Sequence, residues 1–99
     1  MSSADGTAGL AEADATALMA IVRRSLVAAV VRGEVDVPAR DSLPTALSPV
    51  AGCFVTLRTG GELRGCVGAI RAQRPRGVEA ARAAYMAALR DPRFNAVQP

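Results

Sequence analysis

Apolar side chains recur every three or four residues along the first third of the chain, as on one face of an α-helix. The stripe comprises Leu18, Ile21, Val22, Leu26, Ala29 and Val30. Acidic residues stand near its start and Arg32 near its end, as the helix dipole favours. Gly33 is a suitable C-terminal cap. The pattern predicts a helix from about Leu10 to Arg32.

A second helical pattern lies near the end of the sequence. One face carries Val78, Ala81, Tyr85 and Leu89, with Met86 beside them. Asp91 precedes Pro92, and a residue before proline is pushed out of the helical conformation. We therefore predict a helix over Val78 to Arg90. The intervening residues 34–51 contain three prolines and are expected to run extended over the surface of the rest.

A β-hairpin is predicted between the two helices. Phe54, Val55 and Thr56 are strand formers, and Gly60-Gly61 is a two-residue hairpin turn. Strands are expected over 52–58 and 62–71. The predicted pairs are Thr59 with Glu62, Leu57 with Arg64, Val55 with Cys66, and Cys53 with Gly68.

In this register Cys53 and Cys66 lie diagonally on one face, about 7–8 Å apart, which is beyond disulfide reach. A three-residue loop in the hairpin would change this register and so reverse the faces of the strand on which these side chains lie. The fold class expected from these elements is α+β, an antiparallel hairpin or sheet flanked by two helices. Residues 1–9 are small and polar, and are expected to be disordered.

The sequence LRGCVG, residues 63–68, is the most unusual segment of the predicted strands. Glycine packs poorly in a strand, so strand glycines mark a bulge or a close approach by another backbone or a ligand. Gly65 and Gly68 therefore indicate room for a ligand beside Cys66. Arg64, two positions away, is expected on the same face, where its guanidinium favours the thiolate.

Composition narrows the class of protein. The chain is 51% hydrophobic and 21% charged, which is typical of a globular domain, and much of the apolar content is alanine. All twelve basic residues are arginine, and residues 50–99 carry a net charge of +5, so an anionic partner would bind there. No apolar run approaches the roughly 20 residues that span a bilayer. We expect a cytoplasmic protein that does not bind membranes.

The block FVTLRTGGELRGCVGAI, a following helix and then Asp91-Pro92-Arg93-Phe94 resemble the AMMECR-one family, whose microbial members are also called AmmeMemoRadiSam system protein A. Its most distinctive motif, LRGC-(Ile/Val)-G, is complete here. Family members are about twice this long. The resemblance implies that residues 10–99 are the N-terminal half of an AMMECR-one-like domain, a truncated sheet whose open edges invite self-association. It also implies a link to Memo-like and radical S-adenosylmethionine (radical SAM) proteins.

These residues support a binding module as the first hypothesis. Arg64 would clamp a small anionic ligand or an acidic group of a protein partner, with Gly65, Cys66 and Gly68 around it. The resemblance places Asp91 and Arg93 beside them. Alternatively, Arg64 forms an ordinary ion pair with Glu62, and Cys66 is a small buried apolar side chain.

Two further functions remain open. Cys66 as nucleophile with Arg64 as activator would make a thiol-dependent enzyme, although the chain has no histidine to act as base. Arg71, Arg74 and Arg76 would instead serve a nucleic-acid-associated module, but they have no aromatic residue among them. Two cysteines and no histidine cannot supply a zinc site. No metal or other cofactor is expected.

Overall fold

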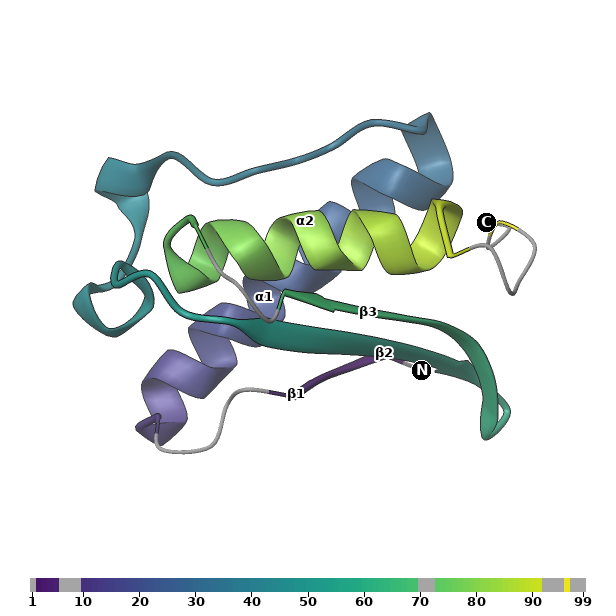
Figure 1. Cartoon of the computed structure of the whole chain (residues 1–99), viewed down its shortest axis with the longest axis horizontal. Helices are drawn as coiled ribbons and strands as arrows, with labels where there is room; N and C mark the ends of the chain where they lie inside the picture. Colours follow the sequence, from purple (N-terminus) through teal and green to yellow (C-terminus); the bar gives the residue numbers. More distant parts are fainter. Residues whose placement is uncertain (1, 6–9, 70–72, 92–95, 97–99) are drawn as a thin grey trace.

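Two helices pack with an antiparallel sheet, which confirms the α+β fold class. The computed structural model describes residues 2–5, 10–69, 73–91 and 96. Figure 1 follows the described elements along the chain. These are β1 (Ser2–Asp5), α1 (Glu12–Val27), the π-helical turn η1 (Ala28–Arg32), the 3₁₀ turns η2 (Arg40–Ser42) and η3 (Thr45–Leu47), β2 (Cys53–Thr59), β3 (Glu62–Ala69) and α2 (Arg76–Leu89).

The predicted first helix is present as α1 followed by η1. Leu18 and Val22 of its apolar stripe are fully buried. Gly33 ends the helix in the left-handed region, with φ 66°. Its N–H donates to the carbonyl oxygen of Ala29 at 2.9 Å. The helix thus ends where the sequence predicts, because only glycine adopts this cap conformation without steric cost.

The second helix, α2, begins two residues earlier than predicted and crosses close to α1. Its buried face consists of small side chains, among them Ala80, Ala81, Ala83, Ala84, Ala87 and Ala88. Small side chains let the two helix backbones approach each other. The fully buried Ser25 of α1 uses this proximity, since its hydroxyl donates to the Ala81 carbonyl oxygen at 2.6 Å. The apolar periodicity of the sequence gave no sign of this contact.

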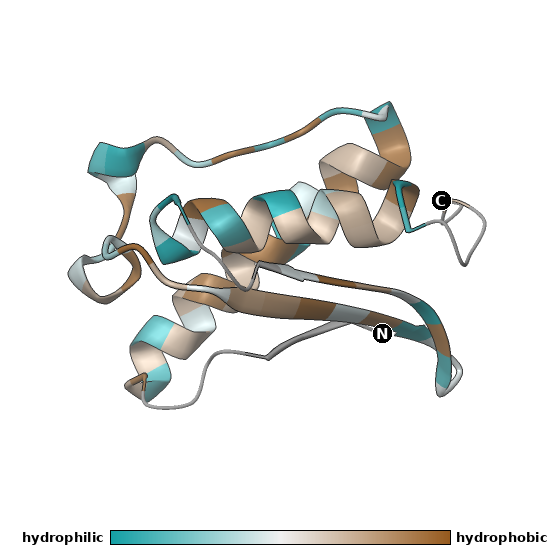
Figure 2. Cartoon of the chain, viewed as in Figure 1, coloured by the Kyte–Doolittle hydropathy of each residue, from teal (hydrophilic) through white to brown (hydrophobic). Residues whose placement is uncertain are grey.

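The sheet has the order β1-β2-β3, with all pairs antiparallel. Cys53, Val55 and Leu57 of β2 face the core and are at least 97% buried. Figure 2 shows the apolar run of β2 beneath α2 and the polar residues at the hairpin end. The expectation of disorder over residues 1–9 differs from the structure at Ser2–Asp5, which pair with the edge of β2 that β3 leaves open.

The hairpin turn is as predicted, but the strand register is not. Gly60 and Gly61 have φ of 59° and 83°, and Thr59 pairs with Glu62. Farther from the turn, a β-bulge at the step between Leu57 and Arg58 leaves Arg64 without an opposite residue. The observed pairs beyond it are Leu57 with Gly65, Thr56 with Cys66, Val55 with Val67, and Cys53 with Ala69.

The predicted pairs Leu57 with Arg64, Val55 with Cys66 and Cys53 with Gly68 are therefore wrong. A turn fixes the register only as far as the first bulge, and a shift of one residue exchanges the two faces of the strand. Cys66 lies opposite Thr56, on the face away from Cys53. The prediction that both cysteines share a face is wrong for the same reason.

The connector between α1 and β2 does more than cross the surface. It contains the turns η2 and η3, and Leu47 of η3 is fully buried in the core. Its end is held by the Arg76 N–H, which donates to the Pro49 carbonyl oxygen at 2.9 Å. The prolines keep the connector extended, and Leu47 anchors it. Among the described helices, none has the length and apolar content needed to cross a membrane.

Candidate functional site

Gly65 allows β3 and α2 to touch through their backbones. A side-chain carbon built on Gly65 would overlap the Ala87 carbonyl oxygen and lie 2.8 Å from the Ala87 carbonyl carbon. Gly65 is buried at this contact. The sequence indicated that this glycine leaves room for a ligand. The structure fills that room with α2, so the first motif glycine serves the close approach of strand and helix.

Gly68 provides a seat for the aromatic ring of Phe54, which lies opposite it in the hairpin. A side-chain carbon on Gly68 would overlap that ring. The ring is nevertheless 42% exposed. The second motif glycine therefore holds a partly exposed aromatic side chain flat on the strand, on the face of the hairpin that is turned away from the core.

Arg64 is the extra residue of the β-bulge. Its Nη2 lies 3.1 Å from Oε2 of Glu62, and both side chains are well exposed, at 47% and 73%. This is the ion pair that the sequence offered as the alternative to a clamp. An exposed pair of this kind contributes less than about 1 kcal/mol, so a stronger acidic partner can replace Glu62. The argument that Arg64 shares a face with Cys66 does not hold, because the bulge breaks the alternation of the strand.

Cys66 is half-buried, and it links the LRGCVG segment to the block that begins at Asp91. Its backbone N–H donates to Oδ2 of Asp91 at 3.0 Å, and Asp91 is 95% buried. Its Sγ lies 3.5 Å from the Thr56 hydroxyl oxygen. The Asp91 carboxylate thus fixes the outer edge of β3 at Cys66. The sequence resemblance had placed Asp91 near this motif, and the hydrogen bond supplies the reason.

The described site contains a thiol, a hydroxyl, a buried carboxylate and, at the bulge, an exposed guanidinium. Arg93, the remaining predicted site residue, lies outside the described residues. The Asp91 carboxylate already accepts a backbone N–H, so its role at Cys66 is to position the strand.

A second group of polar residues lies at the start of α2, on the core side of the sheet. Glu79 is 95% buried and accepts from the Gln73 N–H at 3.2 Å and from the Arg74 guanidinium at 3.5 Å. Burial and, to a lesser extent, the nearby Glu79 carboxylate together raise the pKa of the Cys53 thiol to about 11, although the Arg76 guanidinium acts to lower it. Cys53 is therefore a neutral core side chain.

The sequence analysis gave no sign that Glu79 is buried. A signal for its burial is the pair of arginines at the start of the helix, Arg74 and Arg76. A carboxylate in the first turn can fold back onto such a segment. Within the described stretches, no three Cys, Asp or Glu side chains come together as metal ligands would.

The comparisons with known proteins agree with the motif and the fold. Residues 19–99 match the sequence profile of the AMMECR1 family. A protein of Methanothermobacter thermautotrophicus is 40% identical over 68 residues, which cover 69% of this chain and 35% of that protein. The crystal structure of an uncharacterised protein from Pyrococcus horikoshii is 30% identical, with a TM-score of 0.70 over 82% of this chain and 42% of that one.

The chain thus spans less than half the length of either similar protein. The match nevertheless takes in most of its own residues, including the whole LRGCVG segment and Asp91. The archaeal structure reproduces the same fold at 30% sequence identity. The chain belongs to the AMMECR1 family.

Proposed function

We propose that this chain is a binding module of the AMMECR1 domain that recognises a protein partner through its β-hairpin. The contact region, here called the hairpin surface, consists of Phe54 and Cys66 on the outer face of the hairpin and of Arg64 at the bulge. The observation that carries the proposal is the Phe54 ring, which lies 42% exposed on Gly68. Aromatic and arginine side chains contribute most to protein–protein binding, and here both stand on one hairpin.

The chemistry of the hairpin surface favours a partner with an apolar patch next to an acidic group. The patch would cover Phe54, and the acidic group would take the place of Glu62 at the Arg64 guanidinium. Asp91 stabilises the hairpin surface, because its carboxylate accepts a hydrogen bond from the Cys66 backbone N–H. This support keeps the hairpin in one conformation and so lowers the entropic cost of binding.

The family resemblance gives the proposal named candidates. Memo-like and radical SAM proteins are the partners that it implies, in the cytoplasm. The small anionic ligand that the sequence also allowed would use the same Arg64 guanidinium. A protein partner is favoured because the space beside both motif glycines is filled by Ala87 and Phe54.

Binding of purified Memo-like and radical SAM proteins to the 99-residue chain tests the proposal by isothermal titration calorimetry. Phe54→Ser should weaken binding at least tenfold, as expected for an exposed aromatic anchor. Arg64→Gln should weaken it severalfold, because the charge that would face the acidic group of the partner is lost. The matched controls are Val31→Ser, an exposed apolar residue of η1, and Arg82→Gln, an exposed arginine of α2.

Controls that bind as the unmodified chain does, beside weakened hairpin variants, are the expected result. The proposal fails if neither protein binds at micromolar concentration, or if the control variants weaken binding as much as the hairpin variants. Circular dichroism of each variant shows whether the fold is retained, since the Phe54 ring also packs on Gly68.

A thiol-dependent reaction at Cys66 is the second candidate function. The observation in its favour is the half-buried thiol beside the Thr56 hydroxyl, at 3.5 Å. Iodoacetamide labelling separates the two functions. A nucleophilic cysteine is labelled rapidly already near pH 6, whereas a packed thiol reacts slowly until the solution is alkaline. Slow labelling of Cys66 at neutral pH would leave the binding module as the function.

A further inference from the structure

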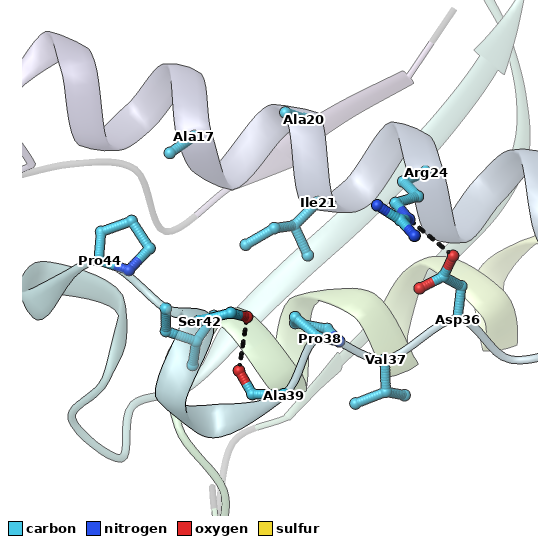
Figure 3. Close-up of a pocket in the computed structure, with 11 residues that line it drawn as sticks. Ala17, Ala20, Ile21, Arg24, Asp36, Val37, Pro38, Ala39, Ser42 and Pro44 are labelled. Carbon is cyan, nitrogen blue, oxygen red and sulfur yellow. Dashed lines mark hydrogen bonds and ion pairs between the residues drawn. The ribbon is translucent and has the colours of Figure 1, made fainter.

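A cavity of about 470 Å³ lies between α1 and the connector, away from the hairpin surface. Figure 3 shows its lining, with Ala17, Ala20 and Ile21 on the helix side and Val37, Pro38 and Pro44 on the connector side. Sites for small molecules have volumes of about 300–1,000 Å³ and are mostly apolar with a few polar groups. The cavity has the volume and the lining of such a site.

The apolar part of the cavity is held by the packing of the connector. Leu43, which lines the cavity, also reaches α2, because a side-chain carbon built on Gly77 would lie 2.5 Å from the Leu43 Cδ2 atom and 3.4 Å from the Ile21 Cδ1 atom. Ile21 and Leu43 therefore separate the cavity from α2. No residue of the hairpin surface lines it. The cavity is thus independent of the proposed function.

An ion pair lies at the solvent-exposed end of the cavity, where 79% of the Arg24 side chain and 25% of the Asp36 side chain are exposed. Arg24 Nε donates to Oδ2 of Asp36 at 2.9 Å, and both residues line the cavity. Figure 3 shows this pair beyond Ile21, where α1 and the connector come together. The bond uses Nε of Arg24 and one oxygen of Asp36. The terminal amino groups of the guanidinium and Oδ1 of the carboxylate are not part of it.

This end of the cavity is neutral overall but bipolar. A ligand with only a carboxylate would gain from Arg24 and be repelled by Asp36, and a ligand with only an ammonium group would meet the reverse. A zwitterion complements both charges at once. Apart from Ser42, the remaining space is lined by alanine, valine, leucine, isoleucine and proline side chains, which favour a branched apolar group.

We propose that this cavity is a binding site for a free α-amino acid with a branched apolar side chain. The ligand carboxylate pairs with the Arg24 guanidinium, and its ammonium group donates to the Asp36 carboxylate. Its side chain lies against Ile21 and Val37. The terminal residue of a peptide offers the same apolar group with only one of the two charges, so the binding test must distinguish the two sources.

The test is a titration of the 99-residue chain, labelled with ¹³C in its isoleucine methyl groups, followed by NMR. The probes are L-leucine, N-acetyl-L-leucine, L-leucinamide and glycine. L-Leucine should shift the Ile21 methyl signal, which is assigned with Ile21→Val, in a saturable manner. The acetylated and amidated forms, which mimic the two peptide ends, should each bind severalfold more weakly, because one ionic contact at a solvent-exposed pair is lost. Glycine should bind more weakly still, because it lacks the apolar group.

Three pairs of variants locate the site. Arg24→Gln and Asp36→Asn should each weaken leucine binding severalfold, whereas Arg23→Gln and Asp41→Asn, which alter exposed charges outside the cavity, should leave it unchanged. Ala20→Phe should block the cavity, while Ala13→Phe on the same helix should not.

The proposal is overturned by any of three results. The first is an Ile21 methyl signal that does not shift at leucine concentrations up to about 10 mM. A dissociation constant above this value is too weak for useful small-molecule binding. The second is equal affinity for leucine and either of its blocked forms. The third is a loss of binding in the control variants that matches the loss in the cavity variants. A result for the hairpin surface, positive or negative, does not affect this test, because the two sites share no residue.

Discussion

Replacement of Gly65 by alanine tests the role assigned to the first motif glycine. The added methyl group would overlap the Ala87 carbonyl oxygen, which belongs to the backbone of α2 and cannot rotate away. The helix would have to move off the strand, and overpacking of a core contact costs about 1–3 kcal/mol. The lower entropy of the unfolded alanine chain returns about 0.5–1 kcal/mol. We therefore expect Gly65→Ala to lower the free energy of unfolding by about 1–2 kcal/mol.

Gly68→Ala is the matched comparison, because it adds the same atoms three residue pairs away in the hairpin. Its methyl group would meet the ring of Phe54, which is 42% exposed and can swing toward solvent. The expected loss is within about 1 kcal/mol. The additional substitution Phe54→Ala removes the clash, so the effects of Gly68→Ala and Phe54→Ala on stability should not add. Truncation of a side chain cannot relieve Gly65→Ala in this way.

Urea unfolding followed by far-UV circular dichroism measures these differences from the midpoint and slope of each transition. The order expected is unmodified chain, then Gly68→Ala, then Gly65→Ala. If Gly65→Ala is as stable as Gly68→Ala, the contact between β3 and the backbone of α2 is not what requires a glycine. A free space beside Gly65, as the sequence first indicated, would then be the better interpretation.

Three further predictions concern buried polar groups. Ser25→Ala should lower the free energy of unfolding by about 1 kcal/mol in urea titrations, because the hydroxyl donates to a buried carbonyl oxygen. Asp91→Ala should cost about 1–3 kcal/mol and speed amide hydrogen exchange at Cys66, whereas Asp91→Asn, which keeps an acceptor oxygen, should cost less. The pKa of Cys53 is raised from 9.0 to about 11 by burial, so the unfolded chain releases its proton first. Stability should therefore fall between about pH 9 and 11, by up to about 3 kcal/mol, and Cys53→Ala should lack this part of the decline.

Local patterns predicted the elements well, and the turn between the strands. The α1 stripe, the Gly33 cap and the Gly60-Gly61 turn all occur where the sequence places them. Each depends on interactions within a few residues along the chain, such as helical periodicity or the positive φ that glycine permits. The LRGCVG motif likewise led to the family by its residues alone.

The faces of the hairpin were beyond local reasoning. The bulge at Arg64 exchanges the sides of every residue after it, and the glycine that follows it lies against Ala87 of a helix more than twenty residues away. Burial of Ser25 and Glu79 depends in the same way on what packs against them. The sequence by itself determined the helices, the turn and the family. Only the tertiary structure decided which way the thiol and the guanidinium face, because a strand register is set by the contacts of the whole sheet and the helix packed on it.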